Sequence, residues 1–387
     1  MAAVITFFPV DNGDMTLLEL ESGRRILIDM NIRQLGDDVR DVAKDLRERL
    51  KTDGDRRPYV DAMLLSHPDW DHIRGLKKHF HLGPLSDYKK PKDGEDPKIV
   101  IREMWSSPMV FRRASNGHTL SDDAKAWNAE AKRRVQLVKD KKTINVGDRI
   151  LILGEDQDGK TDNLGSILVK IGETITRING TADSSFRGLL LAPKPKGSDD
   201  DETLRKKNHS SVIMQFSIAY GTTMDACKFL SGGDAEVAIW ERIWDDHKND
   251  KLKIEYDLLQ PPHHCSWHSL SYDSWSEKGE DAVVSSKARK ALGQARDGAY
   301  IVASSKEIHD DDIDPPCIRA KREYRSITDG VSGEFLNTAI HKDKDGKVVP
   351  LEFEIAADGP VPRKVTKRST SAAAGGAAIG SQPLKHG

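Results

Sequence analysis

Short apolar runs recur along the chain between charged stretches, which is the pattern of strands and amphipathic helices in a mixed fold. The stretch 37–51 places Val42, Leu46 and Leu50 on one stripe and charged residues elsewhere, which predicts a helix. Similar patterns predict helices over 121–139, 235–247, 285–295 and 317–324. Strands are predicted over 5–10, 16–20, 24–29, 59–66, 99–105, 149–154, 210–220, 228–232, 255–260, 299–304, 334–340 and 351–355. Antiparallel groups near both ends with helices between them indicate an α/β (α+β) fold.

The pattern also divides the chain into one domain and a tail. Residues 1–356 carry the predicted helices and strands. Within them, 193–207 mixes both charge signs without periodicity, which predicts a solvated loop. From residue 357 the composition shifts to Pro, Gly, Ala, Ser and basic residues, so we expect a disordered basic tail over 357–387.

Composition narrows the class of protein. Of 387 residues, 37% are hydrophobic, which is enough for a sizeable core, and the net charge of -2 argues against a protein that coats nucleic acid. No apolar run approaches the roughly 20 residues of a membrane helix, and no secretory signal opens the chain. The three cysteines form neither a disulfide framework nor a zinc motif. We therefore expect a cytoplasmic protein without membrane association.

The stretch LLSHPDWDHIRGL (64–76) has the densest group of metal-binding side chain types. His67, Asp69, Asp71 and His72 fall within six residues, directly after the apolar run 59–66. Side chains that leave a strand end can converge on one point, and imidazole combined with carboxylate suits a divalent transition metal. A polar loop with two histidines by chance is the alternative, and the interleaved aspartates argue against it.

Several segments together resemble a known fold family. HPDWDH has the form HxDxDH and resembles the HxHxDH signature of the metallo-β-lactamase fold. Further segments resemble other motifs of that family in the same order, namely TFFPVDNGDMTLLEL with RRILIDMN, NHSSVIMQF (208–216), FLSGGDAE (229–236) and LLQPPHHCSWHS (258–269). The set is most similar to the hydrolase domain of ComEC-type competence proteins. The resemblance covers roughly residues 3–355 and implies an αββα sandwich that holds two divalent ions, zinc or manganese.

The resemblance also implies ligand roles for individual residues. His67 and Asp69 would hold one ion, and the third ligand would be His209, Asn208 or no residue of this motif. Asp71, His72 and His263 would hold the second ion, and Asp234 would bridge both. Asp69 stands where most of the superfamily has histidine, and this harder ligand favours manganese or mixed occupancy over strict zinc at the first metal site. Asp29 would accept backbone hydrogen bonds in the ligand loop, whereas Gly13 and Asp14 would form a tight turn.

Other residues are candidates for catalysis or substrate contact. Asp71 could also orient the attacking hydroxide, and His264 could donate a hydrogen bond to the departing oxygen. Ser266, His268 and His309 are candidate substrate contacts. Trp70 and Trp267 interrupt the ligand loops and would either pack the loops or stack a base. Cys265 lies between histidines and could be a thiol nucleophile, but a metal cluster explains the same histidines.

The resemblance implies a metal-dependent hydrolase in which a metal-bridging hydroxide attacks a phosphodiester. The expected substrate is a nucleic acid or a nucleotide. Fold and metals do not fix the bond that is cleaved, so hydrolysis of an amide, lactam or thioester stays open. A metal-binding partner or regulatory module with little turnover is the third alternative, and nothing in the sequence identifies partner proteins.

Overall fold

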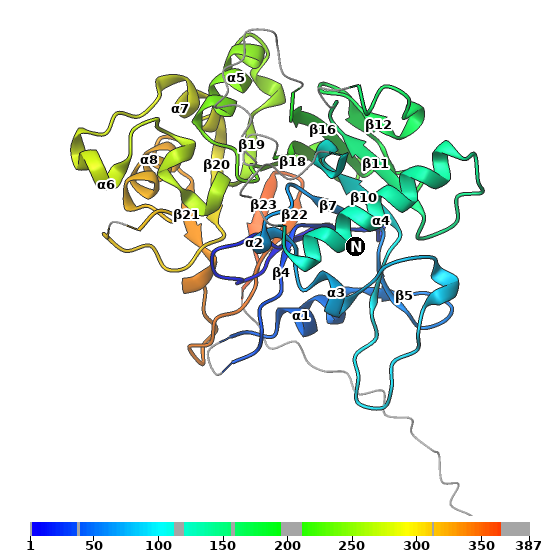
Figure 1. The fold of residues 1–387 in the computed structure, drawn as a ribbon. Coiled ribbons are helices and arrows are strands. Elements are labelled where there is room, and N and C mark those ends of the chain that lie inside the picture. The colour runs from blue at the N-terminus through cyan, green and yellow to red at the C-terminus, as the bar shows by residue number, and fades with distance from the viewer. Residues whose placement is uncertain are drawn as a thin grey trace, which may run out of the picture.

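Two β-sheets lie face to face, and helices cover their outer sides (Figure 1). This computed structural model describes residues 2–36, 39–111, 120–155, 159–194, 211–311 and 313–364. In those ranges, no helix combines the length and the apolar character that crossing a membrane requires.

The first sheet joins the two ends of the described chain. Among the described residues it has nine strands in the order β12-β11-β10-β7-β3-β2-β1-β22-β23. The pairs β1–β2, β2–β3 and β1–β22 are antiparallel, whereas β3–β7, β7–β10 and β10–β11 are parallel. The bounds are β1 Val4–Phe7, β2 Thr16–Glu19, β3 Arg25–Ile28, β7 Ala62–Leu65, β10 Glu103–Ser106, β11 Arg149–Leu153, β12 Leu168–Val169, β22 Leu351–Ala356 and β23 Gly359–Pro362.

The second sheet comes from the later half of the chain. Within the described ranges it has seven strands in the order β13-β16-β17-β18-β19-β20-β21, antiparallel up to β18 and parallel from β18 onward. The bounds are β13 Thr174–Ile175, β16 Phe186–Ala192, β17 Ile213–Tyr220, β18 Thr223–Ser231, β19 Tyr256–Gln260, β20 Ala295–Ala303 and β21 Glu334–Asn337.

Smaller elements complete the described structure. A further small sheet has the order β5-β6-β9-β8, and β14 pairs with β15. The bounds are β4 Met30–Asn31, β5 Lys51–Thr52, β6 Pro58–Val60, β8 Phe80–His81, β9 Ile99–Ile101, β14 Arg177–Ile178 and β15 Thr181–Ala182. The helices are α1 Val42–Arg49, α2 Trp70–Ile73, α3 Leu76–His79, α4 Asp122–Lys139, α5 Val237–His247, α6 Trp275–Lys278, α7 Ser286–Leu292 and α8 Ile318–Asp329.

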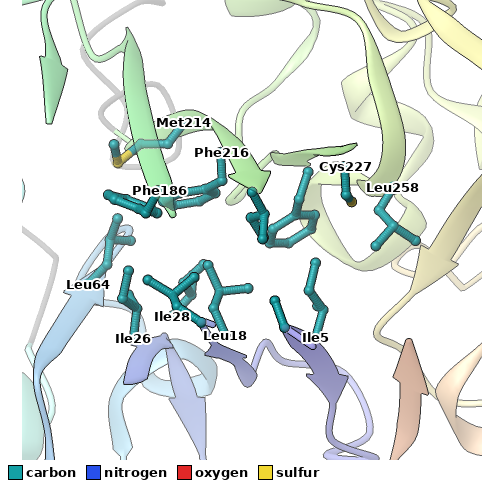
Figure 2. Packing of buried hydrophobic residues seen from close by; sticks show 14 of the residues in the cluster. Ile5, Leu18, Ile26, Ile28, Leu64, Phe186, Met214, Phe216, Cys227 and Leu258 are labelled. Carbon is teal, nitrogen blue, oxygen red and sulfur yellow. The ribbon is translucent and has the colours of Figure 1, made fainter. Parts of the chain in front are cut away.

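Three apolar clusters fix the order of the layers. The cluster between the sheets joins Leu18 and Ile26 of the first sheet to Phe216 and Leu258 of the second (Figure 2). A second cluster packs α1 and α4 on the outer face of the first sheet, and a third packs α5, α7 and α8 on the outer face of the second. Successive side chains alternate between the faces of a strand, so each strand feeds an inner and an outer cluster. The predicted αββα sandwich is confirmed.

The structure refines several predicted boundaries. The predicted strands 59–66 and 99–105 are each divided, into β6 with β7 and β9 with β10. Residues 359–362, predicted as part of the tail, instead form β23, which pairs with β22. Residues 365–387 and most of the predicted loop, 195–207, lie outside the described residues.

Candidate metal centre

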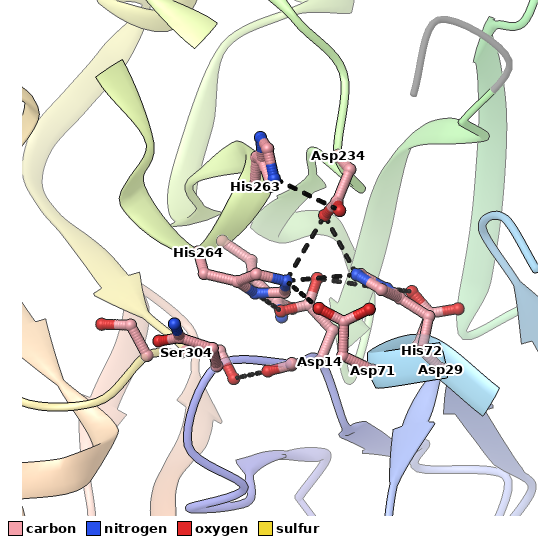
Figure 3. Close-up of polar contacts among 12 residues, drawn as sticks. Asp14, Asp29, Asp71, His72, Asp234, His263, His264 and Ser304 are labelled. Carbon is pink, nitrogen blue, oxygen red and sulfur yellow. Dashed lines mark hydrogen bonds and ion pairs between the residues drawn. The ribbon is translucent and has the colours of Figure 1, made fainter. Parts of the chain in front are cut away.

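Histidines and aspartates from both sheets converge at one edge of the sandwich (Figure 3). His67 follows β7, and Asp71 and His72 lie in α2. Asp234 follows β18, and His263 and His264 follow β19. Because β18 and β19 are parallel neighbours, the loops that leave their carboxyl ends meet at the same edge.

The side chains form two groups that share Asp234. One group contains Asp14, His72, Asp234 and His264, and the other contains His67, Asp69 and Asp234. The Asp234 carboxylate lies between the groups, with Oδ1 3.0 Å from His72 Nε2 and Oδ2 3.2 Å from His67 Nε2. Each group has the histidine and carboxylate donors that could hold a divalent ion, and Asp234 stands where one residue could contact two ions.

Asp29 orients His72 from behind. The Nδ1 of His72 donates a hydrogen bond to Asp29 Oδ2 at 2.8 Å, so the Nε2 lone pair faces the cluster. The other Asp29 oxygen accepts from the backbone N–H of Ser66 at 2.7 Å, and the Ser66 hydroxyl donates to Oδ2 at 2.5 Å. A carboxylate behind a ligating histidine fixes its tautomer in metalloproteins, and Asp29 occupies that position here.

The structure places His264, rather than His263, in the group with His72. His264 Nε2 lies 3.3 Å from His72 Nε2 and 3.3 Å from Asp71 Oδ2. His263 is more distant, with its Nε2 3.9 Å from Asp234 Oδ2, and it belongs to neither group. Both histidines adopt left-handed φ angles, 51° and 54°, which turn the chain so that the second ring points inward. The motif assigned the ligand role to His263 and a hydrogen-bonding role to His264, whereas the geometry groups His264 with His72.

Asp14 is a member of the cluster that the sequence reading assigned to a turn. Its Oδ1 lies 3.3 Å from His264 Nδ1, and its backbone N–H donates to the Asp71 carbonyl at 3.3 Å. The preceding Gly13 has φ of 145°, and a Cβ there would lie 2.2 Å from Asn31 Nδ2, so only glycine fits.

The histidines and carboxylates of the cluster shift each other's pKa values. Burial opposes protonation of His264, but the carboxylates of Asp234, Asp14 and Asp71 outweigh it and raise its pKa to about 10. Burial likewise opposes protonation of His67, yet Asp234 raises its pKa to about 9. For Asp71, burial favours the neutral acid, but the hydrogen bond from His264 and the nearby His72 lower its pKa. The carboxylates therefore create a site that stabilises positive charge.

The buried polar atoms fit a bound cation. Asp14 Oδ1, His67 Nε2, Asp234 Oδ1 and His264 Nδ1 are inaccessible to solvent, and within the described residues their close contacts are ion pairs inside the cluster rather than well-aligned hydrogen bonds. Buried polar atoms that lack partners are costly, and metal coordination is one way to satisfy them. The residues present therefore fit a divalent ion.

The remaining candidates lie at different distances from this cluster. Asp71, which the resemblance made a ligand, belongs to neither group, and its side chain is 35% exposed. The Ser266 hydroxyl is buried and accepts from the backbone of His268. His268 lies 3.9 Å from Asp314, and His309 is largely exposed beside Glu307. The structure does not bring these three residues into either ligand group, and His209 lies outside the described residues.

The two tryptophans and Cys265 differ in environment. Trp267 is fully buried in the core under the second sheet, so it packs the loop. Trp70 is 55% exposed, and the Arg74 guanidinium lies 3.9 Å above its ring. Burial raises the pKa of the Cys265 thiol well above its ordinary value. A thiol in that state is a poor nucleophile, which argues against the thiol hydrolase alternative.

Of the comparisons with known proteins, the one with solved structures finds similar chains. No family model matches the chain, and no curated protein matches it in sequence. Among solved structures, the chain is similar to the crystal structure of unliganded yeast PDE1, with 12% identity and a TM-score of 0.41. The alignment covers 87% of this chain and 97% of that one.

Proposed function

We propose that this chain is a metal-dependent hydrolase that cleaves a phosphodiester bond. The observation that carries the proposal is the buried Asp234 carboxylate, which lies between two histidine–aspartate groups. The choice of phosphodiester over another bond is supported by the resemblance of HPDWDH, SGGDAE and PPHHCS to the ComEC-type hydrolase motifs.

His67, Asp69 and Asp234 would hold one ion, and Asp14, His72, Asp234 and His264 would hold the other. Divalent ions in such a site supply activation of water and neutralisation of charge on a phosphoryl oxygen. The first group has two carboxylates and one histidine among its described members, and this hard donor set favours manganese over strict zinc selectivity.

Asp71 has a different role from the buried ligands. It is anionic and partly exposed, so its carboxylate can accept a hydrogen bond from the attacking water and hold that water in line with phosphorus. His264 is buried among three carboxylates, which suits a ligand better than a donor to the departing oxygen.

The test combines metal analysis with two chromogenic substrates. The purified chain, loaded with manganese or zinc, is assayed on bis-p-nitrophenyl phosphate and on a chromogenic lactam. We expect bound metal and cleavage of the phosphodiester, with both lost in an Asp234→Asn variant. Asp257→Asn is the matched control, because Asp257 is a buried carboxylate of the same sheet that contacts Lys228 and Arg296 instead.

The alternatives predict different results. If only the lactam were cleaved, the bond that the enzyme hydrolyses would be a non-phosphate bond and not a phosphodiester. Tight metal binding without hydrolysis of any substrate would indicate a regulatory metal-binding module and would contradict the proposed enzyme.

A further inference from the structure

A second recess, separate from the metal centre, lies beneath α3 and the loop 87–98. Its volume is about 950 Å³, which is near the upper end for ligand pockets. Its walls come from α1, α3, β8, the loop 87–98 and the start of α4. None of the lining residues belongs to either ligand group of the metal centre.

The recess concentrates positive charge in an otherwise acidic molecule. Seven lysine and arginine side chains line it against three carboxylates, an excess of four positive charges. The whole chain has a net charge of -2, so the remainder carries -6. Like charges gathered in one recess repel each other, and they attract a ligand that carries several negative charges.

Most of these cations have no internal partner to neutralise them. Lys78, Lys89, Lys90 and Lys92 are exposed and form no ion pair with any residue in the described ranges. Arg47 and Lys77 are exceptions, because Arg47 pairs with Asp96 at 3.1 Å and Lys77 pairs with Asp122 at 3.8 Å. The four lysines are therefore available to an external anion.

The loop that carries three of these lysines is anchored. Tyr88 Oη donates to the Lys98 carbonyl at 2.9 Å, and the Arg57 guanidinium lies 5.6 Å from the Tyr88 ring centroid. At the other wall, Lys98 Nζ donates to the Lys77 carbonyl at 2.8 Å. These contacts tie the loop to α3, so the backbone that carries the lysines is held in place at the recess.

We propose that this recess binds the phosphate backbone of a single-stranded nucleic acid. A positively charged groove that follows the backbone is the common feature of proteins that bind single strands. A duplex is a wider and stiffer ligand, and its binding is one of the outcomes that the test below distinguishes. The choice of nucleic acid over another polyanion rests on the phosphodiesterase activity proposed above.

The recess and the metal centre share one stretch of chain. His72 lies in α2, and α3, which lines the recess, begins four residues later at Leu76. A strand bound along α3 would therefore be held beside the ligand loop, which raises the local concentration of its phosphodiesters at the metals.

The test compares two triple variants of the full chain. Lys89→Gln, Lys90→Gln and Lys92→Gln remove three cations from the recess. Lys139→Gln, Lys141→Gln and Lys142→Gln remove three exposed cations at the far end of α4 as the matched control. Binding of a fluorescent phosphorothioate single strand, which resists hydrolysis, is measured by anisotropy at several salt concentrations. Hydrolysis of bis-p-nitrophenyl phosphate is measured in parallel.

We expect the recess variant to bind the strand roughly tenfold more weakly and the control to bind like wild type. The slope of log K against log salt should fall in magnitude by about 2 in the recess variant, since each single-strand phosphate contact contributes about 0.7. Hydrolysis of the small substrate should be unchanged. Equal affinities and slopes for the two variants would overturn the proposal, as would tighter binding of a duplex or of inorganic polyphosphate.

The two proposals can fail separately. If wild type hydrolyses no phosphodiester but the recess variant still loses strand binding, the binding site stands and the proposed enzyme falls. If wild type hydrolyses the phosphodiester and the two variants bind the strand alike, the proposed enzyme stands and the proposed binding site falls.

Discussion

His72 Nδ1 lies 2.8 Å from Asp29 Oδ2, and this hydrogen bond decides which ring nitrogen of His72 faces Asp234. An Asp29→Asn variant would place an amide donor or a weaker acceptor behind the ring. We expect the Nε2 lone pair to be less available and metal affinity to fall about 10- to 100-fold. Metal titration followed by elemental analysis measures the change.

The backbone should tolerate this substitution. Asp29 has φ of 52°, a left-handed conformation that asparagine adopts readily. Asp61→Asn is the control, because Asp61 is also buried, but it contacts Arg25 and Arg102 away from the cluster. Equal metal affinities for the two variants would contradict an orienting role for Asp29.

Variants of the two adjacent histidines test which of them binds metal. The geometry assigns this role to His264, whereas the motif assigned it to His263. His264→Ala should remove metal from the group that contains His72 and should abolish hydrolysis. His263→Ala should retain most of the metal, because His263 Nε2 is 3.9 Å from Asp234 Oδ2 and outside both groups. Metal content per chain, measured for both variants at equal concentration, shows which histidine contributes more to metal binding. A larger loss in the His263 variant would restore the assignment made from the motif.

The pH dependence of the metal-free chain follows from the raised pKa values of its histidines. His67 and His264 have pKa values raised from 6.5 to about 9 and about 10. Their protonated forms therefore stabilise the fold fully below pH 6.5, and this contribution is lost as the pH rises through 9 and 10. Urea unfolding with a chelator present, at pH 7 and pH 9.5, should show the loss. His264→Gln should reduce the loss, whereas the exposed control His309→Gln should leave it unchanged.

Trp70 gives a test of base stacking. Because its side chain is 55% exposed, Trp70→Ala should change the free energy of unfolding by less than about 0.5 kcal/mol. Stacking contributes about 1–3 kcal/mol per base, so affinity for a single strand should fall roughly 5- to 150-fold. Affinity for an abasic strand should stay the same, and Trp70→Phe should recover part of the loss.

Trp267 is the contrasting case. It is fully buried, so Trp267→Ala should destabilise the fold by about 3–5 kcal/mol.

If Trp70→Ala weakened binding of the abasic strand as much as binding of the normal strand, base stacking would not be the role of Trp70.

Much of the fold could be predicted because the periodicity of apolar residues directly records which faces are buried. The helix pattern over 121–139 corresponds to α4 Asp122–Lys139, and RILILG corresponds to β11. The short strands β12 to β15 were not predicted. Each has two residues, as in Thr174–Ile175, and a run that short has no measurable periodicity.

The candidate site was less readable from the sequence. The density of His67, Asp69, Asp71 and His72 marked the ligand loop, because neighbours in the chain stay neighbours in space. Asp14 was not identified, because an aspartate after glycine in a polar stretch is typical of a turn. Its place beside His264 depends on how the two sheets pack, and a local pattern carries no such information.

The ligand groups draw on both halves of the sandwich. Asp14, His67 and His72 come from segments attached to the first sheet, whereas Asp234 and His264 come from the second. Ions held there would act as a clasp between the halves, in addition to the apolar layer between them. Stripping the metal would then loosen the mutual docking of the halves, so catalytic competence and cohesion of the molecule would rise and fall together.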